Sequence, residues 1–79
     1  MKDLESNNKN LEIFGKKIRS TRLSLGMTQE ELALRIQSSR SFISSLELGK
    51  TNPSLLTLIK VCHALSIQDI NFLLENEGQ

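Results

Sequence analysis

The sequence predicts an all-α fold, one compact domain of five helices. Three observations lead to this prediction. Apolar residues recur every three to four positions, serine or threonine precedes three of these segments, and glycine or proline follows the first and the third. A single domain of 79 residues buries only about 60 to 65% of the surface of its unfolded chain. Association with a second copy would therefore add stability.

Composition narrows the class of protein. Three aromatic residues, with no Trp or Tyr, predict an aliphatic core. The single cysteine, Cys62, excludes an intramolecular disulfide and a zinc site built from several cysteines. No apolar run approaches the roughly 18 residues of a membrane span, and the polar first ten residues do not form a signal peptide. We expect a soluble cytoplasmic protein without a metal or cofactor, in which a flexible segment (residues 1–10) and a short tail (76–79) flank one domain (11–75).

The first helix is expected to begin at Leu11 and to end at Gly26, in the left-handed conformation common after a helix. Its apolar positions are Leu11, Phe14, Ile18 and Leu25. The basic residues between them are Lys16, Lys17, Arg19 and Arg22. The helix is therefore amphipathic with a basic side.

Two short helical patterns lie back to back within residues 28–47. Thr28 is an N-cap residue, and Glu31 three positions later lets each side chain bond the other's backbone N–H. The inward face of this second helix is formed by Gln29, Leu32, Ala33 and Ile36. Ser39 is expected to cap the third helix in the same way.

The third helix has an unusual outward face. Ile43 and Leu46 share the inward face, while the far side consists of Arg40, Ser41, Ser44 and Ser45. Serine does not favour helix as Glu and Lys do, so local stability does not explain three outward serines. A surface that lies close against another molecule explains them better.

A loop is expected after the third helix, because Gly49 permits positive φ and Pro53 pushes Asn52 out of the helical region. Ser54 then caps a fourth helix. The expected apolar face of this helix is Leu55, Leu58, Ile59, Cys62 and Leu65.

The fourth helix also carries two residues of types that can bind metals or take part in catalysis. We expect Cys62 to be a buried packing residue, since it lies on the apolar face. His63 has no second His, Cys or paired carboxylate at ligand spacing, so we expect it on the surface.

A short fifth helix is predicted over residues 67–75. It carries more apolar residues than one stripe against a small domain needs, namely Ile67, Ile70, Phe72, Leu73 and Leu74. We expect these five to form the interface with a copy related by two-fold symmetry. The alternative, that all five close the core of the monomer, stays open.

Many positions agree in type and spacing with one known pattern. They are Gly26, Thr28 to Ala33, Ser39 to Ser44, Leu46, Glu47, Gly49, Lys50, Pro53 to Leu55 and the run from Leu58 to Leu65. In these residues the sequence resembles the helix-turn-helix domain of the lambda-repressor, Cro and XRE type, over residues 11–74. The length and the segment from residue 69 to 74 look most like the small controller proteins of restriction-modification systems.

The resemblance implies a lambda-repressor-like DNA-binding domain, with the helix-turn-helix formed by helices two and three. It also implies that Arg22 pairs with Glu47 and touches phosphate; a surface Arg22 with no fixed partner is the alternative. Gln37 stands where the family often has glycine, and a positive φ there would cost about 1 kcal/mol. Ser38 stands at a usually apolar position, and Ile36 is expected to supply the missing packing.

Positive charge is concentrated in one part of the chain. Residues 9–60 hold nine basic side chains against four acidic ones, while residues 61–79 hold three acidic side chains and no Lys or Arg. A solvated surface would explain a charge excess alone. Because this excess coincides with the motif, nucleic acid is the better interpretation.

The residues expected to bind DNA follow from how such helices dock. A recognition helix enters the major groove, and Arg40 is the strongest base reader because its fork can grip guanine O6 and N7, worth roughly 1 to 3 kcal/mol of discrimination. The base-reading candidates are Arg40, Ser41, Ser44, Ser45 and Gln29. The candidates for the DNA backbone are Thr28, Arg22, Arg35, Ser39, Phe42, Lys50, Thr51, Asn52, Lys16 and Lys17, with a thymine methyl as the alternative target of Phe42.

The predicted function is transcription regulation by a homodimer on a palindromic operator in double-stranded DNA, as a controller of restriction-modification genes. A phage-type repressor, a plasmid or antitoxin regulator, and a protein-interaction module without a DNA role stay open, as does RNA polymerase as a further partner. An enzyme is not expected, because no nucleophile has a base at suitable spacing.

Overall fold

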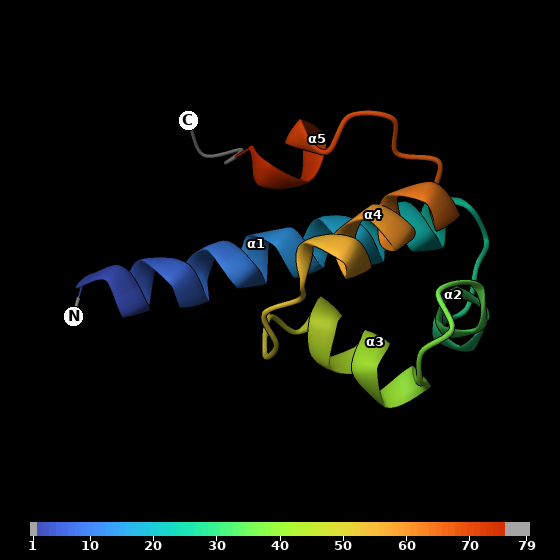
Figure 1. Cartoon of the computed structure of the whole chain (residues 1–79), viewed down its shortest axis with the longest axis horizontal. Helices are drawn as coiled ribbons and strands as arrows, with labels where there is room; N and C mark the ends of the chain where they lie inside the picture. The colour runs from blue at the N-terminus through green and yellow to red at the C-terminus, as the bar shows by residue number, and fades with distance from the viewer. Residues whose placement is uncertain (1, 76–79) are drawn as a thin grey trace.

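The structure is a computed structural model that describes residues 2–75, with side chains from residue 9 onward. This part of the chain folds into five helices (Figure 1), so the predicted all-α fold is confirmed. The helices are α1 (Lys2–Ser24), α2 (Gln29–Arg35), α3 (Arg40–Glu47), α4 (Leu55–Ala64) and α5 (Asn71–Leu74).

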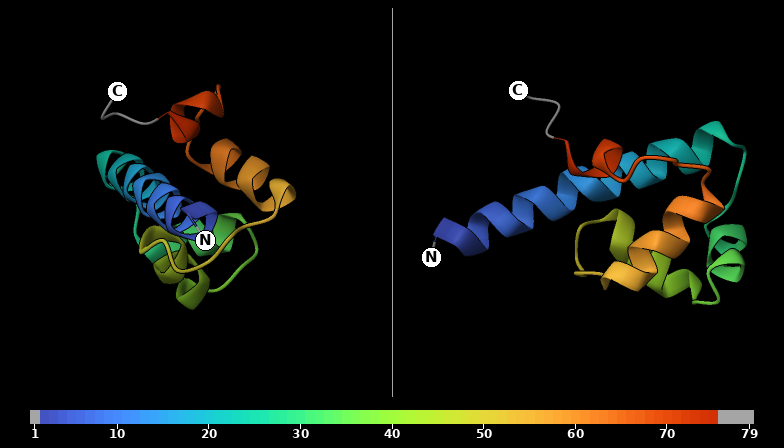
Figure 2. Two further views of the ribbon diagram at one scale, coloured as in Figure 1. Left: turned by 90° about the vertical axis from the view of Figure 1, so that its left-hand side faces the viewer. Right: turned by 45° about the horizontal axis from the view of Figure 1, so that its top comes forward.

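Helix α1 is the element around which the others are arranged. Helices α3 and α5 both pack on α1, and they lie on opposite sides of it (Figures 1 and 2). Helix α2 packs on α3 and on α4. One core joins all five helices, and its buried apolar residues are Phe14, Ile18, Met27, Leu32, Ala33, Ile36, Ile43, Leu46, Val61, Cys62, Leu65 and Leu73.

Helix α1 differs from its predicted extent at both ends. It begins at Lys2, so the segment predicted as flexible is helical from that residue on, and the expected start at Leu11 is wrong. Residues 2–10 contain neither Pro nor Gly, and their Lys, Glu and Leu residues favour helix. At the other end Leu25 follows the last helical residue and is exposed, so it is not part of the apolar face.

Helices α1 to α4 end in the same left-handed turn. In each, the left-handed residue and the residue after it donate backbone hydrogen bonds to carbonyls of the last turn, as in a Schellman motif. The left-handed residue is Gly26 after α1 and Gly49 after α3, but Gln37 (φ 58°) after α2 and Ser66 (φ 57°) after α4. The positive φ expected at Gln37 is present, and the one at Ser66 was not predicted.

The packing expected near this turn is also present. Ile36 is buried and Ser38 is exposed. The polar side chain at position 38 is therefore not trapped beneath the turn.

Helices α1 and α3 approach closely at Gly15, which the sequence analysis did not single out. A Cβ atom at this position would lie 2.5 Å from the backbone oxygens of Leu46 and Glu47. Such a distance is far inside van der Waals contact, so only glycine lets α1 cross the C-terminal end of α3 here. An isolated glycine inside an amphipathic helix was the available signal.

The apolar face of α4 was predicted correctly only in part, since Leu58, Cys62 and Leu65 face the core as expected. Ser54 caps the helix by accepting a hydrogen bond from the Thr57 N–H, as expected. However, Leu55 and Ile59 are exposed, and Val61 is fully buried in their place. Six of the eight residues from 55 to 62 are apolar, so the two possible stripes were hard to distinguish.

Helix α5 is shorter than predicted, because residues 67–70 lie outside it. Ile67 and Ile70 are half-buried against the core. Leu73 is 2% exposed, so its prediction as an interface residue is wrong: the monomer core already encloses it. Only Phe72 and Leu74 of the five predicted interface residues are largely exposed.

Candidate nucleic-acid interface

The outward face of α3 is organised as the sequence predicts. Ser39 caps the helix by accepting a hydrogen bond from the Phe42 N–H at 3.0 Å. Ile43 and Leu46 are fully buried on the inward side. The opposite side presents exposed Arg40 and Ser41 and half-buried Ser44 and Ser45. This face is therefore free to approach a ligand from solvent.

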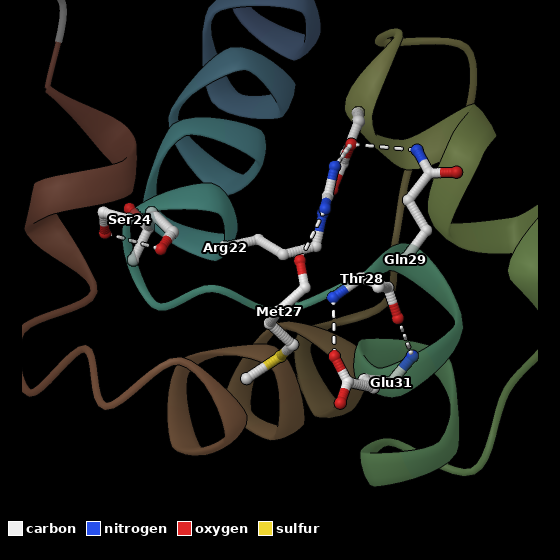
Figure 3. A network of polar contacts seen from close by, with 8 residues as sticks. Arg22, Ser24, Met27, Thr28, Gln29 and Glu31 are labelled. Carbon is white, nitrogen blue, oxygen red and sulfur yellow. Dashed lines mark hydrogen bonds and ion pairs between the residues drawn. The ribbon is translucent and has the colours of Figure 1, made fainter.

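A buried ion pair fixes α3 against the first two helices. Arg22 donates from Nε to Glu47 Oε2 at 2.6 Å and from a terminal nitrogen to Glu47 Oε1 at 3.0 Å (Figure 3). The Gln29 amide also donates to Glu47 Oε1 at 3.0 Å, and Arg22 donates to the Met27 carbonyl at 2.7 Å. Glu47 raises the pKa of Arg22 above its ordinary value. The ion pair expected from the resemblance is therefore present.

This network sets the angle between α2 and α3. It joins the last turn of α1, the turn before α2, the first residue of α2 and the last residue of α3. The capping box at Thr28 and Glu31 lies directly beside it (Figure 3), with bonds of 2.8 and 3.0 Å. Directional hydrogen bonds therefore hold the N-terminal end of α2 and the C-terminal end of α3.

The network also changes the expected roles of two residues. Arg22 is 5% exposed, and its guanidinium already makes three hydrogen bonds, so little of it is left for a phosphate. Gln29 is half-buried, and its amide nitrogen bonds Glu47. Its side chain still lines a hollow together with Ser44 of α3, at the edge of the outward face.

Two basic residues of α1 border the same hollow. Lys16 and Arg19 are exposed and line it beside Gln29 and Ser44. Arg19 was not among the predicted DNA contacts. Its spacing of three from Lys16, which places both on one helical face, was the available signal. Arg40 lines a neighbouring hollow with Thr28 and Gln29, so basic groups flank the start of α2 from both sides.

Lys17 is wrong as a DNA contact. It is 6% exposed, and its Nζ donates hydrogen bonds to the backbone carbonyls of Phe72 (2.9 Å) and Glu75. A step of one residue turns a side chain by 100° around a helix, so Lys17 points toward α5 while its neighbour Lys16 lies beside α3.

The remaining backbone candidates are mostly accessible. Phe42 is the exception, since it is half-buried and packs against the core. Thr51 is half-buried in the loop after α3. The exposed candidates are Thr28, Arg35, Ser39, Lys50 and Asn52.

The reactive side chains of α4 do not form a site. Cys62 is buried as expected, and burial raises the pKa of its thiol. His63 is exposed, also as expected. Among residues 9–75, whose side chains the structure describes, no three His, Cys, Asp or Glu lie at metal-binding distance from one another. In the same part of the chain no helix has the length and apolar character to cross a lipid bilayer.

The five-helix fold, with an accessible polar face on the second of two tightly joined short helices, defines a helix-turn-helix protein. A family model described as helix-turn-helix matches residues 18–69, and the chain belongs to this family of DNA-binding transcription regulators. The resemblance found in the sequence is thereby confirmed, and the function is not enzymatic.

Relatives of this chain include named controller proteins. It is 44% identical over 64 residues to an HTH-type transcriptional regulator of Methanothermobacter thermautotrophicus, covering 77% of this chain and 91% of that protein. It is 41% identical over 62 residues to control protein C.BamHI of Bacillus amyloliquefaciens, covering 77% of this chain and 76% of that protein. The crystal structure of the restriction-modification controller protein C.AhdI from Aeromonas hydrophila is similar with a TM-score of 0.78 and 33% identity, covering 84% of this chain and 94% of that one.

Proposed function

We propose that this protein is a cytoplasmic homodimer that binds a palindromic operator and controls the genes of a restriction-modification system. The observation that carries this proposal is the outward face of α3, where Arg40, Ser41, Ser44 and Ser45 remain accessible while the opposite side is fully buried. The likeness to two controller proteins supports the choice of genes.

Base reading rests on Arg40. It is the first residue of α3, and residues near the N-terminus of a recognition helix are the ones that reach base edges. Ser41, Ser44 and Ser45 supply short hydroxyl groups along the same face. Gln29 stands at the start of α2, where the Glu47 bond orients its amide.

Phosphate binding would come from groups on both sides of this face. The proposed contacts are Thr28, Arg35, Ser39, Lys50, Thr51, Asn52, Lys16 and, from the structure, Arg19. Lys and Arg that neutralise phosphates make binding strongly dependent on salt. We expect the affinity for DNA to fall steeply as salt is added.

Dimerisation would use the C-terminal helices. Phe72 (42% exposed) and Leu74 (62% exposed) of α5 are apolar and accessible, and α4 adds exposed Leu55, Leu56 and Ile59. So many exposed large apolar residues on two short helices are typical of a protein interface. A second copy fits a palindromic site, whose half-sites would lie about one helical turn apart, roughly 34 Å.

The first experiment is to select DNA fragments with the purified protein, to sequence them, and to compare wild type with Arg40→Ala. Loss of the bidentate contact should cost about 1 to 3 kcal/mol on the selected operator and relax specificity at one position. Lys60→Ala, an exposed charge on α4, is the control. If Arg40→Ala binds the operator like wild type, α3 does not read the sequence in the way proposed.

The same selection separates the candidate functions. Operators beside restriction and modification genes support the controller, whereas operators beside phage, plasmid or toxin genes support one of the other regulators. Failure to select any sequence supports an interaction module, and whether RNA polymerase binds beside the occupied operator can then be measured directly.

The dimer is tested by sedimentation of Phe72→Lys. A charge at the centre of an apolar interface should shift the protein toward monomer and weaken operator binding. The matched control is Leu25→Lys, because Leu25 is an exposed apolar residue between α1 and α2. A Phe72→Lys dimer as tight as wild type would place the interface elsewhere.

A further inference from the structure

Two adjacent lysines of α1 have opposite surroundings. Lys16 is exposed beside α3. Lys17 is buried, and its Nζ donates to the carbonyl oxygens of Phe72 and Glu75 and lies 5.5 Å from the centre of the Phe72 ring. Lysine is almost never fully buried unless it is paired, so the burial of Lys17 indicates that its two hydrogen bonds have a structural role.

Helix α5 has few other contacts that hold it in place. It has four residues, no side-chain hydrogen bond at its N-cap, and one buried side chain, Leu73. Its first N–H, on Asn71, is held by the Asp69 carboxylate at 2.9 Å. A helix this short does not form by itself in water, so tertiary contacts must define its position.

Lys17 donates hydrogen bonds to carbonyl oxygens at the C-terminal end of α5, which have no partner within that helix. The last carbonyls of a helix have no partner within the helix and carry partial negative charge, which favours a cation. The Phe72 carbonyl lies in that last turn, and Glu75 is the C-cap residue. The Phe72 ring adds a cation–π contact with the same Nζ.

We propose that Lys17 is a positioning residue for the dimer interface. Its hydrogen bonds hold α5 on α1 in the orientation that presents Phe72 and Leu74 to the second copy. This inference rests on the proposed function, since it assigns a role within the proposed dimer. Lys17 makes no hydrogen bond to α2 or α3 among the described residues, whereas Gly15 and Arg22 of the same helix approach α3 directly. Its effect should therefore be confined to assembly.

The experiment compares Lys17→Met with Lys16→Met, which removes a charge from the adjacent position. For Lys17→Met we expect the dimer dissociation constant to rise about tenfold or more, since hydrogen bonds from a charged group are lost. Binding to the full operator should weaken, while binding to one isolated half-site should not change. Lys16→Met should dimerise like wild type, bind both DNAs more weakly, and lower the salt slope by about one.

Equal losses on the half-site and on the full operator in Lys17→Met would overturn the inference, because they indicate general destabilisation. Lys17→Arg keeps a cation with several donors, so it should recover part of the lost dimerisation. A dimer constant in Lys17→Met equal to that of wild type would also overturn it.

Hydrogen exchange tests Lys17 without reference to the dimer. The amides of Leu73 and Glu75, which bond Ile70 and Asn71, should exchange faster in Lys17→Met than in Lys16→Met. If wild type sediments as a monomer, the proposed dimer fails and this measurement still decides the role of Lys17. Unchanged exchange at both amides overturns that role whatever the oligomeric state.

Discussion

The two ends of this molecule are stabilised in different ways. At one end, the buried Arg22–Glu47 pair joins α1 to α3, and the Gln29–Glu47 hydrogen bond joins α2 to α3. The capping box and Ser39 hold the N-termini of α2 and α3. At the other end, α5 has a single buried side chain, and α4 and α5 leave five large apolar residues exposed. Helix α1 contacts α3 on one side and α5 on the other (Figure 2), while α4 packs on α2.

The difference follows from what each end has to do in a DNA-binding regulator. A surface that reads bases needs side chains held to a fraction of an ångström, and directional bonds between buried charges achieve this. A surface that assembles needs apolar area still in contact with water, because burying that area drives association. The predictions below test whether the first end is as rigid as its bonds indicate and whether the two ends are independent.

The largest effect is expected from Glu47→Ala. Removing the carboxylate leaves the buried Arg22 guanidinium without its partner and frees the Gln29 amide. The free energy of unfolding should fall by about 3 to 5 kcal/mol, as measured by urea denaturation. Glu30→Ala, which removes an exposed carboxylate from α2, is the control. A loss below about 1 kcal/mol would mean that the pair does not fix the two helices.

A smaller loss is expected from Gly15→Ala. Alanine favours helix over glycine by about 1 kcal/mol, but its Cβ would meet two backbone oxygens of α3 that cannot move aside separately. Overpacking of this kind costs about 1 to 3 kcal/mol, so the clash should outweigh the gain in propensity. Ser20→Ala, at an exposed position of α1, measures the propensity gain without the clash. Stabilisation by Gly15→Ala would show that α1 can shift along α3, so that this end is not rigid.

Much of the fold could be predicted because its signals are local. The N-caps at residues 28, 39 and 54 are short-range patterns, and the structure contains all three. The inward pair Ile43 and Leu46 was also predicted, since a spacing of three places them on one face of a helix whose other residues, apart from Phe42, are polar.

The rest depends on contacts between distant elements. Lys16 and Lys17 are both basic residues of an amphipathic helix, and only the position of α5 decides which one is buried. The buried face of α4 was ambiguous for the same reason, because its many apolar residues offer more than one stripe and only the neighbouring helices select one. Gly15 likewise has a role only once α3 crosses α1.

The smallest expected effect is a change of stability with pH that arises from Glu31 in the capping box of α2. Glu31 accepts a hydrogen bond from the Thr28 N–H, and this bond lowers the pKa of Glu31 below its ordinary value. A carboxyl group with a lowered pKa in the folded state stabilises the protein above its unfolded pKa, and that stabilisation is lost as pH falls through the folded pKa. Wild type should therefore lose stability relative to Glu31→Gln as pH falls below about 5, because glutamine keeps an acceptor but does not titrate.

Urea denaturation at several pH values measures this difference, with Glu30→Gln as a control that leaves the capping box in place. Because Glu31 bonds only Thr28 among the described residues and not α5, the dimer constant of Glu31→Gln should equal that of wild type at each pH. A difference between wild type and Glu31→Gln that stays constant down to about pH 3 would mean that the capping carboxylate does not stabilise α2 through its charge. A dimer constant that differed between wild type and Glu31→Gln as pH falls would show that the two ends are coupled, through α1 or through the contact of α2 with α4.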